Sequence, residues 1–461
     1  MKSYSLQPTD ENILESFCKD SIGRNQHVFR FIQLLNAIQD ECCTIAINGE
    51  WGSGKTFFVK QAKLILDMLN PQTIVSEDIR NKIQSYLPDE VKAANSLVSV
   101  YYDAWINDNH DDPILSLIYS TIASRQSDFT VEKKRSLLSG AAALAGALTG
   151  RDIKTVFEEC CGDDVLKPLR DSDNIRTLVK EFIGNLIEER GNRLVLFIDE
   201  LDRCKPDYAI RFLERIKHYF DDNRVTFVFS VSLSQLQAIV KTYYGTDFGA
   251  TRYLDKFFDL RLSLPGPSLE HYMRNRLEVY QDTILDYTCI GTAQYFNFSL
   301  REVERYVRLI KIAIKPGFTE MMDSRPEMQA LRFSVSYIFP VMVGLQMTDI
   351  NKYLEFVAGN DPGPLSDILS MPNIGLMQNP PINIHEEEYD AEAQIIKNRR
   401  TPEDTITPAE RLISIYRALF SEAFDVHNYR TVIANMRFTA ETRQAVKEMV
   451  ALLAPCSNYN I

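Results

Sequence analysis

The sequence predicts an α/β fold centred on a doubly wound, mainly parallel sheet. Five short runs rich in β-branched and aromatic residues carry this prediction. Most of them are apolar at every position, which is typical of strands covered by helices on both faces. The segments between them are long enough for crossover helices, which parallel strands require. The runs are residues 42–49, 96–105, 193–200, 224–232 and 257–265.

Helices are expected to surround these strands from the start of the chain. Residues 11–40 and residues 56–69 both place apolar side chains at helical spacing. The second and third strands are separated by residues 107–190, which is more than one crossover helix needs, so we expect a helical insertion there. It carries the charged run Glu132–Arg135. The predicted core with this insertion spans residues 1–265.

No membrane span is expected. The apolar segment Leu137–Leu148 is twelve residues long, whereas a spanning helix needs about 20. Its small residues suit close packing against another helix. The N-terminus has no apolar secretory core, and the eight cysteines show no C-x-x-C spacing. We therefore expect reduced thiols and a cytoplasmic protein.

The strand signal ends at Pro265. Helical periodicity then continues, which predicts a helical lid region over residues 266–357. Residues 358–461 begin with an irregular segment rich in proline and glycine, which contains the charged run His385–Asp390. A helical block follows at about residues 408–454. The sequence assigns no role to this last part of the chain.

The net charge argues against one broad class of function. The 461 residues include 51 basic and 63 acidic side chains, for a formal net charge of -12. A sequence-independent grip on nucleic acid needs many cations facing phosphates, so broad nucleic-acid binding of that kind is not expected. The sequence shows no strong sign of direct nucleic-acid binding, although composition leaves a local basic patch open. The six histidines show no metalloprotease spacing.

A glycine-rich loop between the first strand and the helix after it carries the clearest chemistry. It matches the pattern G-x-x-x-x-G-K-[ST] at every fixed position. In a P-loop the glycines let backbone N–H groups surround phosphate oxygens, the lysine bridges the terminal phosphates, and the hydroxyl reaches Mg²⁺. The strand before it and the helix after it are the context that a P-loop requires. The predicted nucleotide-binding residues are Gly49, Gly52, Ser53, Gly54, Lys55 and Thr56.

Two acidic residues complete a predicted hydrolytic site. Asp199 and Glu200 follow the apolar run of residues 193–198, at the carboxyl end of a strand, where open α/β sheets bind ligands. We expect Asp199 to hold Mg²⁺ and Glu200 to polarise the water that attacks the γ-phosphate. The fold class is therefore a P-loop NTPase sheet of the ASCE type, with ATP and Mg²⁺ as ligands.

Several further motifs, in order, resemble the KAP family of P-loop NTPases. Residues 198–222, IDELDRCKPDYAIRFLERIKHYFDD, are similar to that family's D-[DE]-L-D-R-C-x-P element and the L-E-x-I-K-x-x-F that follows it. Residues 20–24 resemble its D-x-x-G-R opening, and residues 102–105 with Asp112–Pro113 resemble its F-N-A-W region. Residues 253–265 look like its Y-L-x-K-x-F element. The resemblance covers about residues 18–310.

The resemblance adds candidate residues at the rim of the site. Asp202 and Arg203 would lie there and meet a neighbouring subunit, as an arginine finger does, or form an ion pair within the chain. Lys256 is a second candidate for action on a neighbour. Arg301, in the Ser299-Leu300-Arg301 element of the lid, would reach the phosphates or else remain a surface arginine.

Two other positions near the loop are singled out. Where family members often carry an aspartate that senses the γ-phosphate, this chain has Ser232. The resemblance thus implies a sensor without its charge. Trp51, inside the P-loop, would pack against the insertion or cover nucleotide.

The leading functional hypothesis is an ATPase that acts as a switch or assembly motor in bacterial anti-phage defence, the setting that the resemblance implies. ATP is preferred to GTP because no guanine-reading N-K-x-D element occurs; Asn351-Lys352 continues as Tyr353-Leu354. The alternative is an ATP-gated oligomeric scaffold with negligible turnover that recruits an effector nuclease. A DNA translocase is disfavoured by the acidic balance, and a small-molecule kinase by the Asp199–Glu200 pair.

Overall fold

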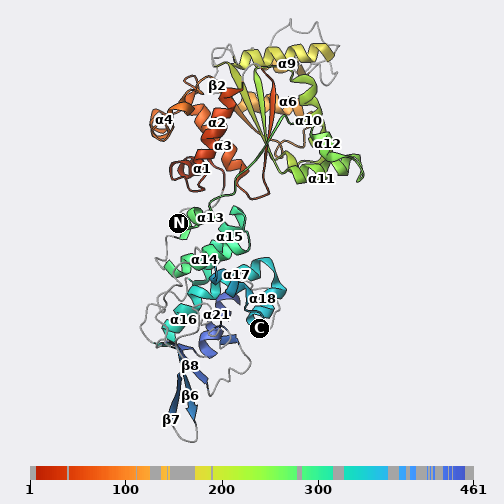
Figure 1. Ribbon diagram of the computed structural model, residues 1–461. Coiled ribbons are helices and arrows are strands. Elements are labelled where there is room, and N and C mark those ends of the chain that lie inside the picture. The colour runs from red at the N-terminus through yellow and green to blue at the C-terminus, as the bar shows by residue number, and fades with distance from the viewer. Residues whose placement is uncertain are drawn as a thin grey trace. The chain divides into compact units, whose positions relative to one another are not determined.

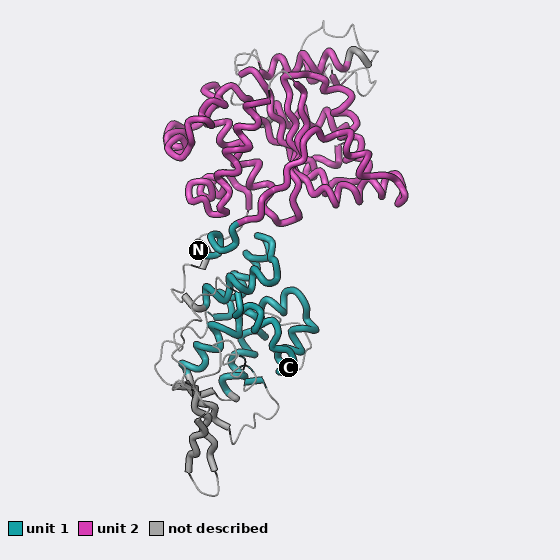
Figure 2. The backbone as a smooth tube through the Cα atoms, in the orientation of Figure 1, with its two compact units in different colours: residues 1–6, 268–461 teal, residues 7–267 magenta. Residues whose placement is uncertain are grey.

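The computed structural model divides the chain into two compact units, Gln7–Pro267 and a unit that contains Ser268–Ile461 (Figure 2). Each unit is described by itself. The structure describes residues 7–38, 41–110, 112–124, 137–142, 144–145, 172–187, 191–277, 283–314, 326–371, 384–390, 395–400, 413, 416, 419–420, 429–433, 436–438 and 440–451.

The first unit is built on a five-stranded sheet in the order β2-β3-β4-β1-β5 (Figure 1). All neighbouring strands pair in parallel, with Asp199 of β3 opposite Asp103 of β2 and Ser230 of β4. β4 thus lies between the P-loop strand β1 and the acidic strand β3, as in ASCE-type sheets. The strands are β1 (Cys43–Asn48), β2 (Leu97–Asp103), β3 (Arg193–Asp199), β4 (Val225–Val231) and β5 (Leu260–Ser263).

Each predicted strand is present, and helices cover both faces of the sheet (Figure 1). Helices on one face are α1 (Asp10–Cys18), α2 (Asn25–Ala37), α3 (Lys55–Leu69), α4 (Glu77–Gln84) and α5 (Asp89–Lys92). Those on the other are α6 (Pro113–Ser124), α9 (Ser172–Ile187), α10 (Pro206–Tyr219), α11 (Leu233–Tyr244) and α12 (Ala250–Leu254). The predicted doubly wound α/β fold is confirmed.

Side chains of β3 show why an unbroken apolar run forms a central strand. Every residue of β3 is buried. Val195 and Phe197 enter the core under α1–α5, whereas Leu194, Leu196 and Ile198 enter the core under the helices of the other face. Successive side chains of a strand point to opposite faces, so a strand that is covered twice must be apolar throughout.

Helices α6 and α9 belong to the predicted insertion, but the charged run Glu132–Arg135 lies outside the described residues. Asp112 caps α6, because its Oδ1 accepts hydrogen bonds from the N–H groups of Ile114 at 2.9 Å and Leu115 at 3.2 Å. The Asp112 carboxylate also pairs with Arg215 of α10. Asp112 and Arg215, which both lie in motifs that resemble the KAP family, thus connect α6 to α10.

The second unit is largely helical where it is described. Its helices are α13 (Leu269–Leu277), α14 (Thr283–Tyr295), α15 (Leu300–Ile314), α16 (Pro326–Tyr337), α17 (Phe339–Thr348), α18 (Ile350–Val357), α19 (Gly363–Leu369) and α21 (Ala440–Ala451). Within the described residues no single helix is long and apolar enough to cross a membrane; the bent pair Met328–Tyr337 and Phe339–Thr348 meets that test only in combination.

A four-stranded antiparallel sheet lies where the sequence analysis expects an irregular segment and helices. Its order is β7-β6-β8-β9, and its strands are β6 (Ile384–Asp390), β7 (Ile395–Arg400), β8 (Tyr429–Ile433) and β9 (Met436–Phe438). Strand β6, which contains the charged run His385–Asp390, pairs with β7 and also with β8, which lies about forty residues further along the chain. Backbone pairing at that distance leaves little trace in the local apolar pattern, so sequence periodicity did not show it.

We expect Phe212→Ala to lower the free energy of unfolding by about 3–5 kcal/mol. Phe212 is completely buried, and its ring lies 5.7 Å from Tyr102 and 6.3 Å from Phe229, between centroids. Urea unfolding followed by circular dichroism measures the loss. The matched control is Phe248→Ala, since that ring is 36% exposed, and its cost should be near 1 kcal/mol. Equal costs for the two variants would contradict this account of the core.

Candidate functional site

The P-loop follows β1, and its backbone has the conformation that the motif predicts. Gly52 and Gly54 have φ angles of 80° and 89°, in the left-handed region that glycine adopts without strain. A Cβ atom at Gly49 would lie 2.8 Å from the Ser53 Oγ, so a side chain there would force Ser53 to move. The loop turns directly into α3, whose N-terminal N–H groups suit an anion.

Arg24 is hydrogen bonded to the P-loop and to the segment after β5. Its side chain is 2% exposed, and its guanidinium donates to the Ser53 carbonyl at 2.8 Å and to the Pro265 carbonyl. The Arg24 N–H in turn donates to Asp20 Oδ1 at 2.9 Å. Burial lowers the pKa of Arg24 to about 10, so it stays charged at neutral pH. The D-x-x-G-R motif was visible in the sequence, but this contact, across more than two hundred residues, was not.

Lys55 lies inside the loop with 8% exposure. Its Nζ donates to the carbonyls of Gly49 at 2.7 Å and Glu50 at 3.3 Å. Burial lowers the pKa of Lys55, while the carboxylates nearby oppose that effect. The Ser53 Oγ is buried and has no hydrogen-bond partner among the described residues. A cationic Nζ and an unsatisfied hydroxyl in a glycine loop fit a phosphate group.

Asp199 ends β3 and is 1% exposed. The Tyr101 hydroxyl donates to its Oδ2 at 3.0 Å, and the hydroxyl groups of Ser230 and Thr56 are near enough to lower the pKa of this carboxyl. Burial raises the pKa of Asp199, and these hydroxyl groups oppose the rise. A carboxylate beside a threonine hydroxyl suits Mg²⁺, which takes few protein ligands and completes its shell with phosphates and water. In the described part of the chain, no group of three or more His, Cys, Asp or Glu side chains could hold a metal alone.

Glu200 follows with a left-handed backbone, at a φ angle of 62°. Such a conformation is uncommon for a residue with a side chain and occurs most often at functional sites. Burial, and then the negative charge of Asp199, raise the pKa of Glu200 to about 7 against the opposing charge of Arg203. A carboxyl group with a pKa near neutrality is suited to accept a proton from water.

Asp202 connects the P-loop to the end of β4. Its Oδ2 accepts hydrogen bonds from Trp51 Nε1 at 2.8 Å and from the Ser232 N–H at 2.9 Å. Asp202 is 4% exposed, whereas Trp51 is 47% exposed. The resemblance implied a sensor position without its charge at Ser232. In the structure, the carboxylate of Asp202 lies next to Ser232 and accepts a hydrogen bond from its N–H.

Arg203 forms an ion pair within the chain, one of its two predicted roles. Its Nε pairs with Glu200 Oε2 across the 3₁₀ turn Leu201–Arg203. Its guanidinium carbon also lies 5.7 Å from the Trp51 ring centre and 5.5 Å from that of Trp105. The structure therefore brings Lys55, Asp199, Glu200 and Arg203 to one edge of the sheet.

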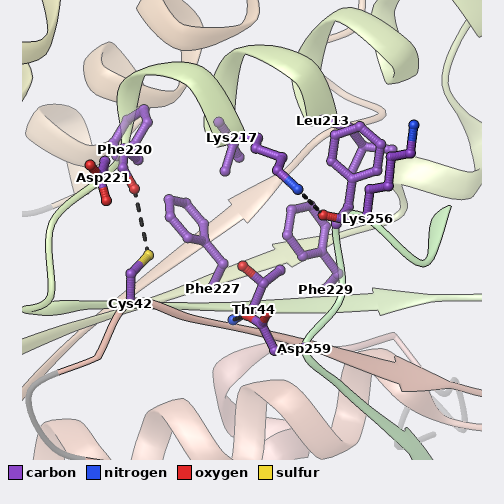
Figure 3. A pocket seen from close by; sticks show the side chains of 12 residues that line it. Cys42, Thr44, Leu213, Lys217, Phe220, Asp221, Phe227, Phe229, Lys256 and Asp259 are labelled. Atoms are coloured by element: carbon purple, nitrogen blue, oxygen red, sulfur yellow. Dashed lines mark hydrogen bonds between the residues drawn. The ribbon is translucent and has the colours of Figure 1, made fainter. Parts of the chain in front are cut away.

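Lys256 lines a pocket of about 140 Å³ together with several phenylalanine side chains (Figure 3). The pocket lies beside the start of β1, where the Thr44 N–H donates to Asp259 Oδ2 at 2.7 Å. The P-loop begins at the other end of β1. Lys256 and the Lys55 of the same chain are thus separated by the length of that strand. Its predicted action on a neighbouring subunit remains a prediction.

Arg301 belongs to the second unit, where it is exposed in the first turn of α15. The turn is closed by a capping box. The Ser299 N–H donates to Glu302 Oε2 at 2.8 Å, and the Glu302 N–H donates to Ser299 Oγ at 3.4 Å. This explains the serine of the Ser-Leu-Arg element by helix capping. The predicted contact of Arg301 with phosphates remains a prediction.

Comparisons with known proteins identify the domain. The family model described as the KAP family P-loop domain matches residues 24–313. No curated protein matches the chain in sequence. Among solved structures, the chain is similar to the Aeropyrum pernix ORC2 protein in its ADPNP-ADP complexes, at 12% identity over 90% of this chain and 95% of that chain, with a TM-score of 0.32. The ADP form of that protein gives 13% identity, coverage of 88% and 92%, and a TM-score of 0.29.

We expect Glu200→Gln to raise the melting temperature of the nucleotide-free chain, and to do so more at pH 8 than at pH 5. The pKa of Glu200 is about 7 in the folded chain and 4.5 by its ordinary value. Between these values the folded chain binds more protons than the unfolded chain, so stability falls as the pH rises. Glutamine removes this loss because it does not ionise.

Thermal unfolding at the two pH values measures the effect. Glu181→Gln, at an exposed position of α9 in the same unit, is the matched control and should show no such pH dependence. An equal gain for Glu200→Gln at pH 5 and pH 8 would contradict the raised pKa.

Proposed function

The chain belongs to the KAP family of P-loop NTPases, and we propose that it is a Mg²⁺-dependent ATPase that works as a nucleotide-driven switch. The observation that carries this proposal is the convergence of Lys55, the Thr56–Asp199 pair and Glu200 at the carboxyl edge of one sheet. Each supplies a different part of phosphate hydrolysis.

The proposed roles follow from the contacts of each residue. Lys55 now donates to loop carbonyls and would donate to the terminal phosphates instead. Thr56 and Asp199 would hold Mg²⁺, which neutralises charge on the phosphates when it is bound. Glu200 would orient the attacking water and accept its proton. The N–H groups of the P-loop would surround the phosphate oxygens.

ATP is the proposed nucleotide. The sequence contains two N-K pairs, and neither continues as a guanine-reading N-K-x-D element: Asn81-Lys82 is followed by Ile83-Gln84, and Asn351-Lys352 by Tyr353-Leu354. The N–H groups of Asn351 and Lys352 donate to Asp349 Oδ1 at 3.0 and 3.2 Å, so these two residues form the first turn of α18 after its N-cap. Helix capping thus accounts for the second pair. Hydrolysis of GTP at rates well above those of ATP would overturn the choice.

The second candidate is an ATP-gated oligomeric scaffold with negligible turnover, which recruits an effector nuclease. The ion pair between Glu200 and Arg203 favours it, because a carboxylate held by a guanidinium is less available to water. In both cases we propose a role in bacterial anti-phage defence, on the basis of family kinship. Loss of protection against phage in cells that carry Lys55→Ala, compared with the wild type, would support that setting.

Glu200→Gln distinguishes the two candidates. In an ATPase it should lower the rate of phosphate release by about 10²-fold or more and leave ATP binding, measured by calorimetry, intact. In a scaffold the variant should behave as the wild type does. Lys55→Ala should weaken ATP binding in both cases, and Glu181→Gln should change neither quantity. Undiminished turnover in Glu200→Gln would exclude Glu200 as the base.

Nucleotide-dependent self-assembly is the second test. We expect light scattering to give a larger mass with ATP than with ADP for the wild type and no such difference for Lys55→Ala. The physical reason is that a switch must expose or order different surfaces in its two nucleotide states. An unchanged mass with both nucleotides would remove assembly from the proposal.

A further inference from the structure

The guanidinium of Arg203 is enclosed by groups from separate loops of the site. Trp51 belongs to the P-loop, Trp105 to the segment after β2, and Glu200 to the turn after β3. The guanidinium carbon lies within 6 Å of both indole ring centres, at 5.7 and 5.5 Å, which is the range of cation–π attraction. The side chain is 22% exposed. The Arg203 guanidinium therefore lies between the two indole rings and the Glu200 carboxylate, and most of the side chain is shielded from solvent.

Hydrogen bonds position the residues that surround the Arg203 guanidinium. Trp51 Nε1 donates to Asp202 at 2.8 Å, which orients the first indole. The segment that carries Trp105 is fixed by Lys205, whose N–H donates to Asp108 Oδ2 at 3.2 Å and whose Nζ donates to Asn109 Oδ1 at 2.6 Å. Since Lys205 is two residues after Arg203, the Trp51 indole and the backbone segment that carries Trp105 are both hydrogen bonded to the region around the arginine.

Arg203 also lies beside the loop that would hold the terminal phosphates. Its guanidinium carbon is 5.7 Å from the ring centre of Trp51, which is a P-loop residue between Gly49 and Lys55. A γ-phosphate held by Lys55 would carry more negative charge than a carboxylate and would offer oxygens that match the planar guanidinium. It would compete with Glu200 for Arg203. A diphosphate has no such group to offer.

We propose that Arg203 is a positioning residue that holds Glu200 in the nucleotide-free chain and exchanges this carboxylate for the γ-phosphate when a triphosphate binds. The inference rests on the proposed ATPase function and adds its regulation. Glu200 is released to water only when a triphosphate is present, and ADP leaves the ion pair in place. A ligand shifts an equilibrium only through its different affinity for the two states, and here the γ-phosphate supplies that difference.

Tryptophan emission tests this exchange directly. The chain contains two tryptophans, and both contact the Arg203 guanidinium. We expect a non-hydrolysable ATP analogue to change the emission of the wild type and saturating ADP to leave it nearly unchanged. Trp51→Phe and Trp105→Phe each leave a single tryptophan and show which indole responds. The same change with ADP and with the analogue would overturn the proposal.

Arg203→Ala should abolish the emission change that is specific for the triphosphate. It should also lower the preference for the analogue over ADP by on the order of tenfold, within the usual range of coupling between bound groups. Arg203→Lys keeps the charge but not the planar fork, so it should restore only part of that preference. Circular dichroism checks that each variant is folded. An unchanged preference in Arg203→Ala would overturn the proposal.

Arg211→Ala is the matched control. Arg211 also pairs with an acidic residue of its own segment, Asp207, at 2.5 Å, but on α10. Its removal should leave emission and nucleotide preference as in the wild type. If calorimetry detects no nucleotide binding to the wild type, the proposed ATPase function itself fails. Binding of both nucleotides without a difference in emission rejects only the role of Arg203.

Discussion

Burial of several charges at the carboxyl edge of the sheet is the constraint on which the rest of this site depends. Asp199 and Asp202 are almost completely buried, and Lys55 is nearly so. Taking an ion out of water is costly unless partners with good geometry replace the water. The Tyr101 hydroxyl, the Ser232 N–H and the loop carbonyls supply that replacement. Their positions are therefore as much a condition of folding as of nucleotide binding.

The strand order explains why these charges meet. β4 lies between β1 and β3, so the P-loop and the acidic turn end on either side of the Val231–Ser232 segment. The carboxyl ends of parallel strands open on the same edge. Gly49 donates to the Val231 carbonyl at 3.2 Å, and Asp202 accepts from the Ser232 N–H. The central strand thus receives a hydrogen bond from one loop and donates one to the other.

Those parts of the molecule that depend on local pattern could be predicted from the sequence. The five strands of the first unit follow from runs that are apolar at every position, and the P-loop follows from fixed glycines between a strand and a helix. The reach of Arg24 to Pro265 could not be predicted, because no periodicity records a contact at that separation. The strands Ile384–Asp390 and Tyr429–Ile433 could not be predicted for the same reason. They form by pairing with each other, and the local sequence pattern of neither records that pairing.

Trp51 shows a different limit. The sequence offered packing against the insertion or covering of nucleotide for this side chain, but the structure places its indole against Asp202 and Arg203. Such a contact depends on the rotamers of the side chains at a turn of one 3₁₀ segment. A motif fixes which residues are present at a site. The motif does not determine which of several nearby charged groups each side chain contacts.

The adjacent residues Asp202 and Arg203 connect the P-loop, the end of β4 and Glu200 with one another. Asp202 joins the P-loop to the end of β4, and Arg203 joins both indoles to Glu200. A γ-phosphate that draws the Arg203 guanidinium away from Glu200 would therefore also change the surroundings of both indoles. Packed side chains with alternative partners respond in discrete steps rather than by gradual deformation. A change in the phosphate group can thus reach Glu200 within the first unit, without requiring movement of the second.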